Sequence, residues 1–219
     1  MTRVAAALSC FQGELSTTAA ANLLDLGFAA LQLTPGCVPQ KELNDVIAGV
    51  VTTTHHGWSP RAMRRSVWQD GNLVTDADSI HPPLARDADS FWKLDPATLP
   101  IIEVMYPSYT LGTGREVRRA MESGMKLAVD LSHLWIQLHS GACTDSDVDA
   151  LLAYDHIAEI HVSHNDGTRD SHSPLTLDSY GLGWAAERTD VPVVFEGYLH
   201  RLTDQQRREQ VELLRSTLG

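Results

Sequence analysis

Short apolar segments alternate with helical segments along most of this chain. The apolar segments are rich in Val, Ile, Leu and Ala, which is typical of buried strands. Strands that alternate with helices form a parallel sheet, because each helix provides the crossover to the next strand. Strands are therefore expected at 4–8, 28–33, 50–54, 73–80, 101–105, 126–130, 157–162 and 191–195, with the weakest pattern at 73–80.

The number of strands favours a closed barrel over an open sheet. Eight parallel strands with helical crossovers form a (β/α)8 barrel, and 219 residues are enough for a compact one. An open doubly wound sheet is the alternative, but no Gly-x-Gly-x-x-Gly motif follows the first segment. The sequence therefore predicts an α/β protein with a single domain over residues 1–219, a compact TIM barrel.

Capping residues mark the start of several predicted helices. Ser16 or Thr17 is predicted to cap the first helix, and Asp145 is predicted to cap a later one. Thr203 and Gln206 have the spacing of a capping box at the start of the last helix. Each of these signals follows a predicted strand, as an alternating β/α order requires.

The composition narrows the choice of partner and compartment. A formal net charge of −11 opposes the approach of a polyanion, so nucleic acid is an unlikely partner. No apolar segment is long enough to span a bilayer, and the N-terminus lacks the pattern of an export signal. Because Cys10, Cys37 and Cys143 form no Cys-x-x-Cys pair, we expect no disulfide framework and a cytoplasmic protein.

Side chains that can bind metal ions follow the predicted strands. Such side chains cost several kcal/mol to bury unless they are paired or bound to a metal. The carboxyl ends of barrel strands converge at one opening, where TIM barrels carry their active sites. Carboxylates combined with imidazoles suit Mn, Fe, Co or Zn better than an ion that prefers thiolates. The predicted metal-binding residues are His55 or His56, His81, Glu103, Asp130, His133, His161, Asp170, His172 and Glu196.

Five short motifs follow one another in an order and spacing known from one group of enzymes. They are Ile102-Glu103-Val104, Asp130-x-x-His133, Glu159-Ile160-His161-Val162, Asp170-x-His172 and Val194-Phe195-Glu196. Together they resemble the xylose isomerase-like barrel superfamily. This superfamily includes sugar isomerases and epimerases, endonuclease IV, and multinuclear non-haem iron enzymes that oxidatively modify peptides. The resemblance covers most of the chain and is strongest after about residue 100.

The branches of this superfamily differ in the number of ions that they bind. Resemblance to the epimerases implies one ion held by Glu103, Asp130, His161 and Glu196, with Glu103 and Glu196 as acid and base. Resemblance to endonuclease IV implies three ions, and this chain has a candidate for each of the further ligands. We therefore expect a multinuclear site, in which Glu103, Glu196 and His133 are the catalytic candidates.

Three reactions are compatible with the resemblance. The iron enzymes share much of the C-terminal ligand pattern, which implies O2-dependent oxidation of a peptide or small thiol by two or three iron ions. The alternative is a sugar or sugar-phosphate isomerase or epimerase that uses Mn, Co or Zn. The third is a zinc phosphodiesterase, because His133 stands where the iron enzymes usually carry Asn and endonuclease IV carries His. We expect a small-molecule or peptide substrate, and a homodimer is compatible with this class.

Overall fold

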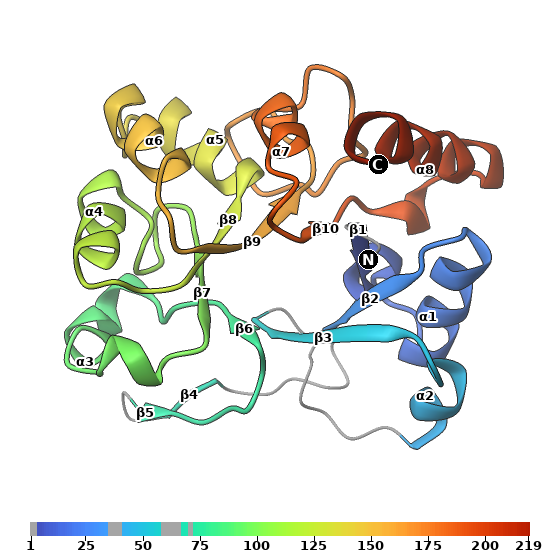
Figure 1. Cartoon of the computed structure of the whole chain (residues 1–219), viewed down its shortest axis with the longest axis horizontal. Coiled ribbons are helices and arrows are strands. Elements are labelled where there is room, and N and C mark those ends of the chain that lie inside the picture. Colours follow the sequence, from blue (N-terminus) through green and yellow to red (C-terminus); the bar gives the residue numbers. More distant parts are fainter. Residues whose placement is uncertain (1–3, 35–40, 58–66, 70–71) are drawn as a thin grey trace.

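A closed barrel forms the centre of the structure. The computed structural model describes residues 4–34, 41–57, 67–69 and 72–219. Within these residues, eight parallel strands close into a ring that is surrounded by helices (Figure 1). This arrangement confirms the predicted TIM barrel. In barrel order, the strands are β1 (Val4–Ala7), β10 (Val193–Phe195), β9 (Ile157–Val162), β8 (Leu127–Asp130), β7 (Ile101–Val104), β6 (Ser79–Ile80), β3 (Val51–His56) and β2 (Ala30–Leu33).

Amphipathic helices cover the outside of the barrel. In the last helix, for example, Val211, Leu214 and Leu218 are buried at helical spacing while the residues between them are more exposed. The helices are α1 (Ser16–Asp25), α2 (Lys41–Val46), α3 (Ala88–Phe91), α4 (Gly114–Glu122), α5 (Leu131–His139), α6 (Asp145–Leu152), α7 (Leu182–Glu187) and α8 (Asp204–Leu218). Short 3-10 helices lie at Leu8–Phe11, Ala85–Asp87, Pro96–Thr98 and Leu199–Arg201.

The helix starts agree only in part with the predicted caps. The Thr203 capping box at α8 is confirmed. The prediction for α1 is wrong, because extended Leu15 occupies the cap position and no side chain caps the helix. The prediction for α6 is wrong by one residue: Thr144 caps the helix and forms a capping box with Asp147. The Thr-x-x-Asp spacing satisfies two backbone amides at once, whereas Asp145 lies in the first turn.

The weak strand predicted at 73–80 is shorter than expected. Only Ser79–Ile80 joins the barrel, between β3 and β7. Two further strands, β4 (Trp68–Gln69) and β5 (Asn72–Leu73), form a separate antiparallel pair. Just before this strand, the Asp78 carboxylate accepts a hydrogen bond from the Thr54 amide at 2.8 Å, so a side chain and not the backbone ties Asp78 to β3.

Alternation along the strands separates the apolar core from the polar interior. Ile102 and Val104 of β7 are part of the apolar core, and Glu103 lies between them, so its side chain points to the opposite face. The same alternation places Phe195 of β10 in the core and directs Glu196 the other way. Core residues therefore face the helices, and the predicted metal-binding residues face the interior of the barrel.

The cysteines and the helices agree with the expectations from the sequence as far as the described residues extend. Cys10 and Cys143 are free and buried, and Cys37 lies outside the described residues. None of the helices in the described part of the chain has the length and apolar content needed to cross a bilayer.

Candidate metal centre

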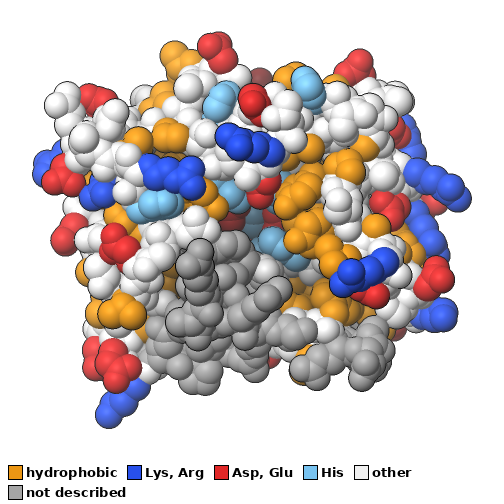
Figure 2. Space-filling model, turned by 180° about the vertical axis from the view of Figure 1, so that it is seen from behind, with side chains coloured by type: hydrophobic (Ala, Val, Ile, Leu, Met, Phe, Trp, Pro, Cys, Tyr) orange, Lys and Arg blue, Asp and Glu red, His pale blue; other side chains and the backbone are white. Residues whose placement is uncertain are grey.

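The predicted metal-binding residues come together at one end of the barrel. They lie at the carboxyl ends of β3, β7, β8 and β9, in the first turn of α5, or in the loops after β6, β9 and β10. Figure 2 shows histidine and acidic side chains in a hollow near the middle of this face. That these residues bind metal ions stays a prediction.

Glu103 is the hub of this cluster. One carboxylate oxygen, Oε2, lies 3.2 Å from His55 Nε2 and 3.1 Å from His81 Nε2. The other oxygen, Oε1, lies 3.1 Å from His133 Nδ1 and 3.7 Å from His161 Nδ1. The side chain is 1 % exposed, so one buried anion faces imidazoles from four segments. The sequence did not distinguish between His55 and His56 as the candidate ligand, and these contacts place His55 in the cluster.

Asp130 belongs both to the cluster and to the start of a helix. Its Oδ1 accepts hydrogen bonds from the amides of Ser132 at 2.7 Å and His133 at 3.1 Å, which caps α5. This leaves Oδ2 buried and directed toward His133 Nε2, 3.5 Å away. The Asp-x-x-His spacing therefore has a physical meaning, because the cap holds the carboxylate while the first helical turn carries the imidazole back toward it.

The loop after β9 contributes Asp170 and His172. Asp170 Oδ2 lies 3.0 Å from His172 Nε2 and 3.3 Å from His133 Nε2. His172 has a positive φ of 43°, a conformation that costs a non-glycine residue about 1–3 kcal/mol. The Tyr198 amide donates a 2.7 Å hydrogen bond to the His172 carbonyl and so helps to hold this conformation. This conformation places the His172 imidazole against the Asp170 carboxylate.

Glu196 closes the ring opposite Glu103. Its Oε1 lies 3.5 Å from His161 Nδ1, and its Oε2 lies 3.9 Å from His172 Nδ1. Burial is the main cause of a raised pKa at Glu196, which the charge of His161 only partly offsets. Burial also raises the pKa of Glu103, but the charges of His81 and His161 outweigh it and hold that pKa well below its usual value. Two carboxylates in one cluster thus differ in proton affinity.

The imidazoles respond to the same charges. Burial opposes protonation of His133, but Asp130 and Asp170 raise its pKa well above the usual value. Burial dominates at His81, whose pKa is lowered. In the metal-free protein, protons on some imidazoles therefore balance the carboxylates in the way that cations would.

The donor atoms form three groups that could each hold an ion. Within each group, the ligand atoms lie within 4.8 Å of one another. Glu103 is shared by the first two groups and Asp130 by the last two, so each carboxylate could bridge neighbouring ions. The groups are His55, His81 and Glu103; Glu103, Asp130 and His133; and Asp130, His161 and Glu196.

Several donor atoms make no hydrogen bond to the described residues although they are buried. Buried polar atoms are normally paired, so this pattern indicates that a ligand supplies the missing partner. The set fits divalent ions, because it contains carboxylate oxygens and imidazole nitrogens. The atoms are His55 Nε2, Glu103 Oε2, Asp130 Oδ2, His133 Nε2, His161 Nδ1, Asp170 Oδ1 and His172 Nδ1.

Two tyrosines stand beside the cluster. The Tyr106 ring lies edge-on to His133 with centroids 4.9 Å apart, and the Tyr198 ring lies 5.0 Å from that of His172. Burial is the main cause that raises the pKa of each tyrosine to about 12. Both phenols therefore keep their hydrogen at neutral pH and can donate it to an oxygen of a bound molecule.

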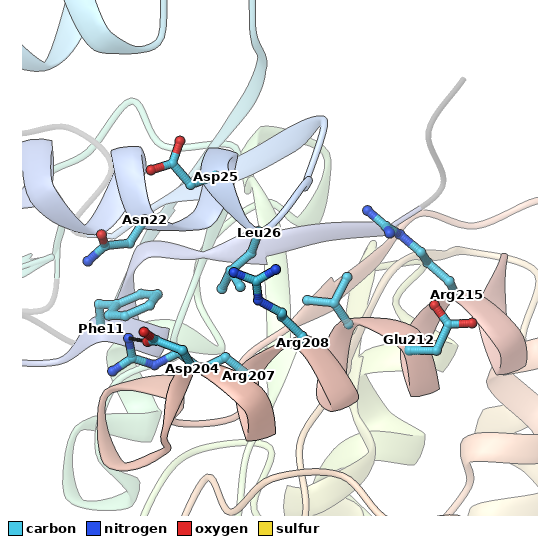
Figure 3. Close-up of a pocket in the computed structure, with 10 residues that line it drawn as sticks. Phe11, Asn22, Asp25, Leu26, Asp204, Arg207, Arg208, Glu212 and Arg215 are labelled. Carbon is cyan, nitrogen blue, oxygen red and sulfur yellow. Dashed lines mark hydrogen bonds and ion pairs between the residues drawn. The ribbon is translucent and has the colours of Figure 1, made fainter.

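A cleft of about 480 Å³ lies away from this centre, between α1 and α8 (Figure 3). Two of its three arginines already have partners: Arg207 donates to the Leu199 carbonyl and to Asp204, and Arg215 donates to the Gly27 carbonyl. None of the predicted metal-binding residues lines it. The cleft therefore adds nothing to the candidate centre.

Sequence patterns assigned no role to Glu159, which lies beneath the cluster. Its side chain is buried and contacts His161, which it precedes by two residues in β9. A carboxylate at this spacing in a buried strand points to the same face as the imidazole, so the motif Glu159-Ile160-His161 carried a usable signal.

The stability of the metal-free protein is expected to fall as the pH rises from about 6.5 to 9. Burial opposes protonation of His172, but Asp170 outweighs it and raises the pKa to about 9. A histidine whose pKa is raised by folding stabilises the folded protein fully below its unfolded pKa of about 6.5. This stabilisation is lost as the pH rises to the folded pKa. The loss amounts to at most about 3 kcal/mol. Urea denaturation of chelator-treated protein at several pH values measures it.

A variant isolates the contribution of His172. His172→Gln is expected to flatten the dependence between pH 6.5 and 9, whereas His139→Gln, at an exposed position, is expected to leave it unchanged. Asp170 affects the stability at acidic pH instead. Its pKa is lowered in the folded protein, so the stability that its charge adds is lost as the pH falls below the usual carboxyl range. Equal slopes for wild type and His172→Gln would contradict the assignment.

Comparisons with known proteins agree with this fold. No family model matches the chain, and no curated protein is similar to it. A 3-keto-D-glucoside 4-epimerase from E. coli has a similar structure with 14 % identity and a TM-score of 0.63, over 99 % of this chain and 100 % of that chain. A D-tagatose 3-epimerase-like protein follows with 10 % identity and a TM-score of 0.66, over 99 % and 97 %.

A third structure comes from a different class of enzyme. An AP endonuclease of family 2 from Brucella melitensis shows 15 % identity and a TM-score of 0.59, over 99 % of both chains. At these identities the likeness establishes the fold alone. The predicted architecture is thereby confirmed: this chain is a closed (β/α)8 barrel similar in structure to these enzymes.

Proposed function

We propose that this chain is a divalent-metal-dependent enzyme whose centre binds more than one ion. The observation that carries the proposal is the overlap of three donor groups through Glu103 and Asp130. Buried carboxylates and imidazoles at the ends of so many strands are costly to maintain without bound cations. Sites of this kind lie at the carboxyl end of TIM barrels, where these enzymes carry out their chemistry.

For the reaction, we favour isomerisation or epimerisation of a small sugar or sugar phosphate. Glu103 and Glu196 approach the same nitrogen of His161, at 3.7 and 3.5 Å, so both carboxylates face the same region of the centre. When bound there, a divalent ion polarises a substrate carbonyl. One carboxylate can then take a proton from the carbon beside that carbonyl, and the other can return a proton to its opposite face.

The structural neighbours support this reaction over the oxidative one. Two of the three are described as epimerases or as epimerase-like, and none is described as an iron-dependent oxidative enzyme. Tyr106 and Tyr198 hold phenol groups beside the cluster, which suits a substrate with hydroxyl groups. Within the described residues, no feature of the cluster favours iron over Mn, Co or Zn.

Hydrolysis of a phosphoester is the second candidate, because a specific observation favours it. Asp170 lies 3.3 Å from His133 Nε2 and 3.0 Å from His172 Nε2, so these three residues form a contiguous group of donor side chains that extends the centre. A one-ion epimerase needs no such group, whereas several ions together stabilise the attacking and leaving oxygens in phosphoryl transfer. The charge of −11 makes a small phosphoester a better candidate substrate than nucleic acid.

Metal content and solvent-proton exchange test the proposal together. Plasma mass spectrometry of anaerobically purified protein should find more than one divalent ion per chain. The loaded protein is then incubated in D2O with a panel of ketoses, aldoses and their phosphates, and deuterium incorporation at the carbon beside the carbonyl is followed by NMR. Incorporation supports the isomerase. Hydrolysis of bis(p-nitrophenyl) phosphate without incorporation supports the second candidate.

Two results would contradict the proposal. Less than half an ion per chain after reconstitution with Mn²⁺, Co²⁺, Zn²⁺ or Fe²⁺ would exclude a metal-dependent enzyme. Iron-dependent O2 consumption with a thiol or peptide, without deuterium incorporation or phosphoester hydrolysis, would restore the oxidative prediction.

A further inference from the structure

A layer of buried polar side chains lies beneath the candidate centre. It contains Glu159 of β9, which is 4 % exposed, together with Gln32 of β2 and Ser79 of β6, which are fully buried. None of the three belongs to a group that could hold an ion. Burying a carboxylate in a barrel is unfavourable unless its partners compensate for the lost hydration, so the contacts of Glu159 need an explanation.

Glu159 determines the orientation of His161. Its Oε1 lies 3.1 Å from His161 Nε2 and also accepts a hydrogen bond from the Gln32 amide. An ionised carboxylate only accepts hydrogen bonds, so Nε2 of His161 must carry the hydrogen. The other ring nitrogen, Nδ1, then faces the centre, where it lies 3.5 Å from Glu196 Oε1. This nitrogen is buried and makes no hydrogen bond to the described residues.

Glu159 reaches a second histidine through Ser79. The Ser79 hydroxyl is near enough to Glu159 to help lower the pKa of that carboxylate, and its Oγ lies 2.9 Å from His55 Nδ1. A hydroxyl has one hydrogen, and the carboxylate can only accept it, so the Ser79 oxygen accepts from His55 Nδ1. The His55 Nε2 is thereby left to face Glu103, 3.2 Å away.

We propose that Glu159 is a positioning residue that fixes which nitrogen two histidines present to the metal centre. It directs Nδ1 of His161 through a direct hydrogen bond and Nε2 of His55 through Ser79. The carboxylate also makes the imidazole of His161 a stronger ligand, as outer carboxylates do for metal-binding histidines. This inference rests on the proposed metal centre. The competing explanation is that Glu159 only stabilises the barrel by pairing with His161.

Variants at two positions separate these explanations, with Co²⁺ alone as the probe. Glu159→Gln keeps an acceptor for His161 but removes the charge, and it should weaken Co²⁺ binding by about 10-fold. Glu159→Met removes the acceptor as well and should weaken it by about 100-fold. Gln32→Met serves as the matched control. Gln32 donates a hydrogen bond to Glu159, but among the described residues it makes no hydrogen bond to an imidazole. Gln32→Met should change the Co²⁺ affinity by less than about 3-fold, whereas loss of a residue that hydrogen-bonds directly to a metal ligand typically weakens binding by about 10-fold or more.

A second measurement does not depend on metal binding. In the metal-free protein, long-range ¹H–¹⁵N spectra at a pH where the imidazoles are neutral report which ring nitrogen carries the hydrogen. The wild type should show hydrogen on Nε2 of His161 and on Nδ1 of His55. Ser79→Ala should release His55 from this preference and leave His161 unchanged. Glu159→Met should release His161.

The outcomes distinguish the two proposals. Co²⁺ affinities of Glu159→Gln and Glu159→Met equal to that of wild type would overturn the positioning role, even if both variants were less stable. An unchanged preference at His55 in Ser79→Ala would overturn the path through Ser79. If wild type bound no Co²⁺ but showed the predicted hydrogen positions, the metal centre would fail while the role of Glu159 in orienting His161 would stand. If Glu159→Met did not fold, Glu159→Gln and Ser79→Ala still decide the question.

Discussion

Glu103→Gln is expected to lower the bound metal by at least one ion per chain and to reduce turnover by about 10²–10⁴-fold. Glu103 belongs to two of the three donor groups and contacts four imidazoles. A neutral amide would be a weaker ligand for a cation than an anionic carboxylate, so both donor groups that contain Glu103 would be impaired together. Metal content by mass spectrometry and deuterium incorporation at saturating substrate measure the two effects.

The same substitution is expected to destabilise the metal-free protein. Removing one partner of a buried ionic cluster costs about 3–5 kcal/mol, because the other charges lose their compensation. The pKa of Glu103 is lowered in the folded protein, so its contribution is present at neutral pH and disappears in acid. The difference between wild type and variant should therefore shrink as the pH falls.

An exposed glutamate provides the control for both measurements. Glu209→Gln in α8 makes the same change of charge and shape at the surface, and it should leave metal content and stability unchanged. Wild-type metal content and stability in Glu103→Gln would show that Glu103 is not the hub of the centre.

The sequence predicted the barrel and the position of the cluster for one physical reason. Side chains alternate along a strand, so a carboxylate between two core residues, such as Glu103 between Ile102 and Val104, must point into the barrel. Parallel strands place such residues at the same end. The pattern that identified the strands therefore also located the residues that meet.

The pattern could not predict contacts made across the barrel. The contacts of Glu159 with Gln32 and Ser79 join strands that are far apart in sequence, so no local periodicity encodes them. The same holds for the hydrogen bond between Asp78 and Thr54, just before the short strand β6. Residues 58–66 and 70–71, which come before this strand, lie outside the described residues.

Glu196→Gln is expected to abolish turnover, by about 10³-fold or more, while it preserves the fold. Glu196 contacts His161 and His172 from one side of the centre, and it belongs to one donor group only. The group of His55, His81 and Glu103 should therefore still bind an ion. Formation of the epimerised product should disappear, because one of the two carboxylates that take and return the substrate proton is gone.

The contrast between the two glutamates is the strongest test of the proton-transfer mechanism. Glu103→Gln should lose metal and turnover together, whereas Glu196→Gln should lose turnover with most of the metal retained. Glu187→Gln, at an exposed position in α7, controls for the change of charge. If Glu196→Gln retained both metal content and turnover, the assignment of the whole centre would be wrong, because the structure places no carboxylate other than Glu103 and Glu196 within 4 Å of His161 Nδ1 among the described residues.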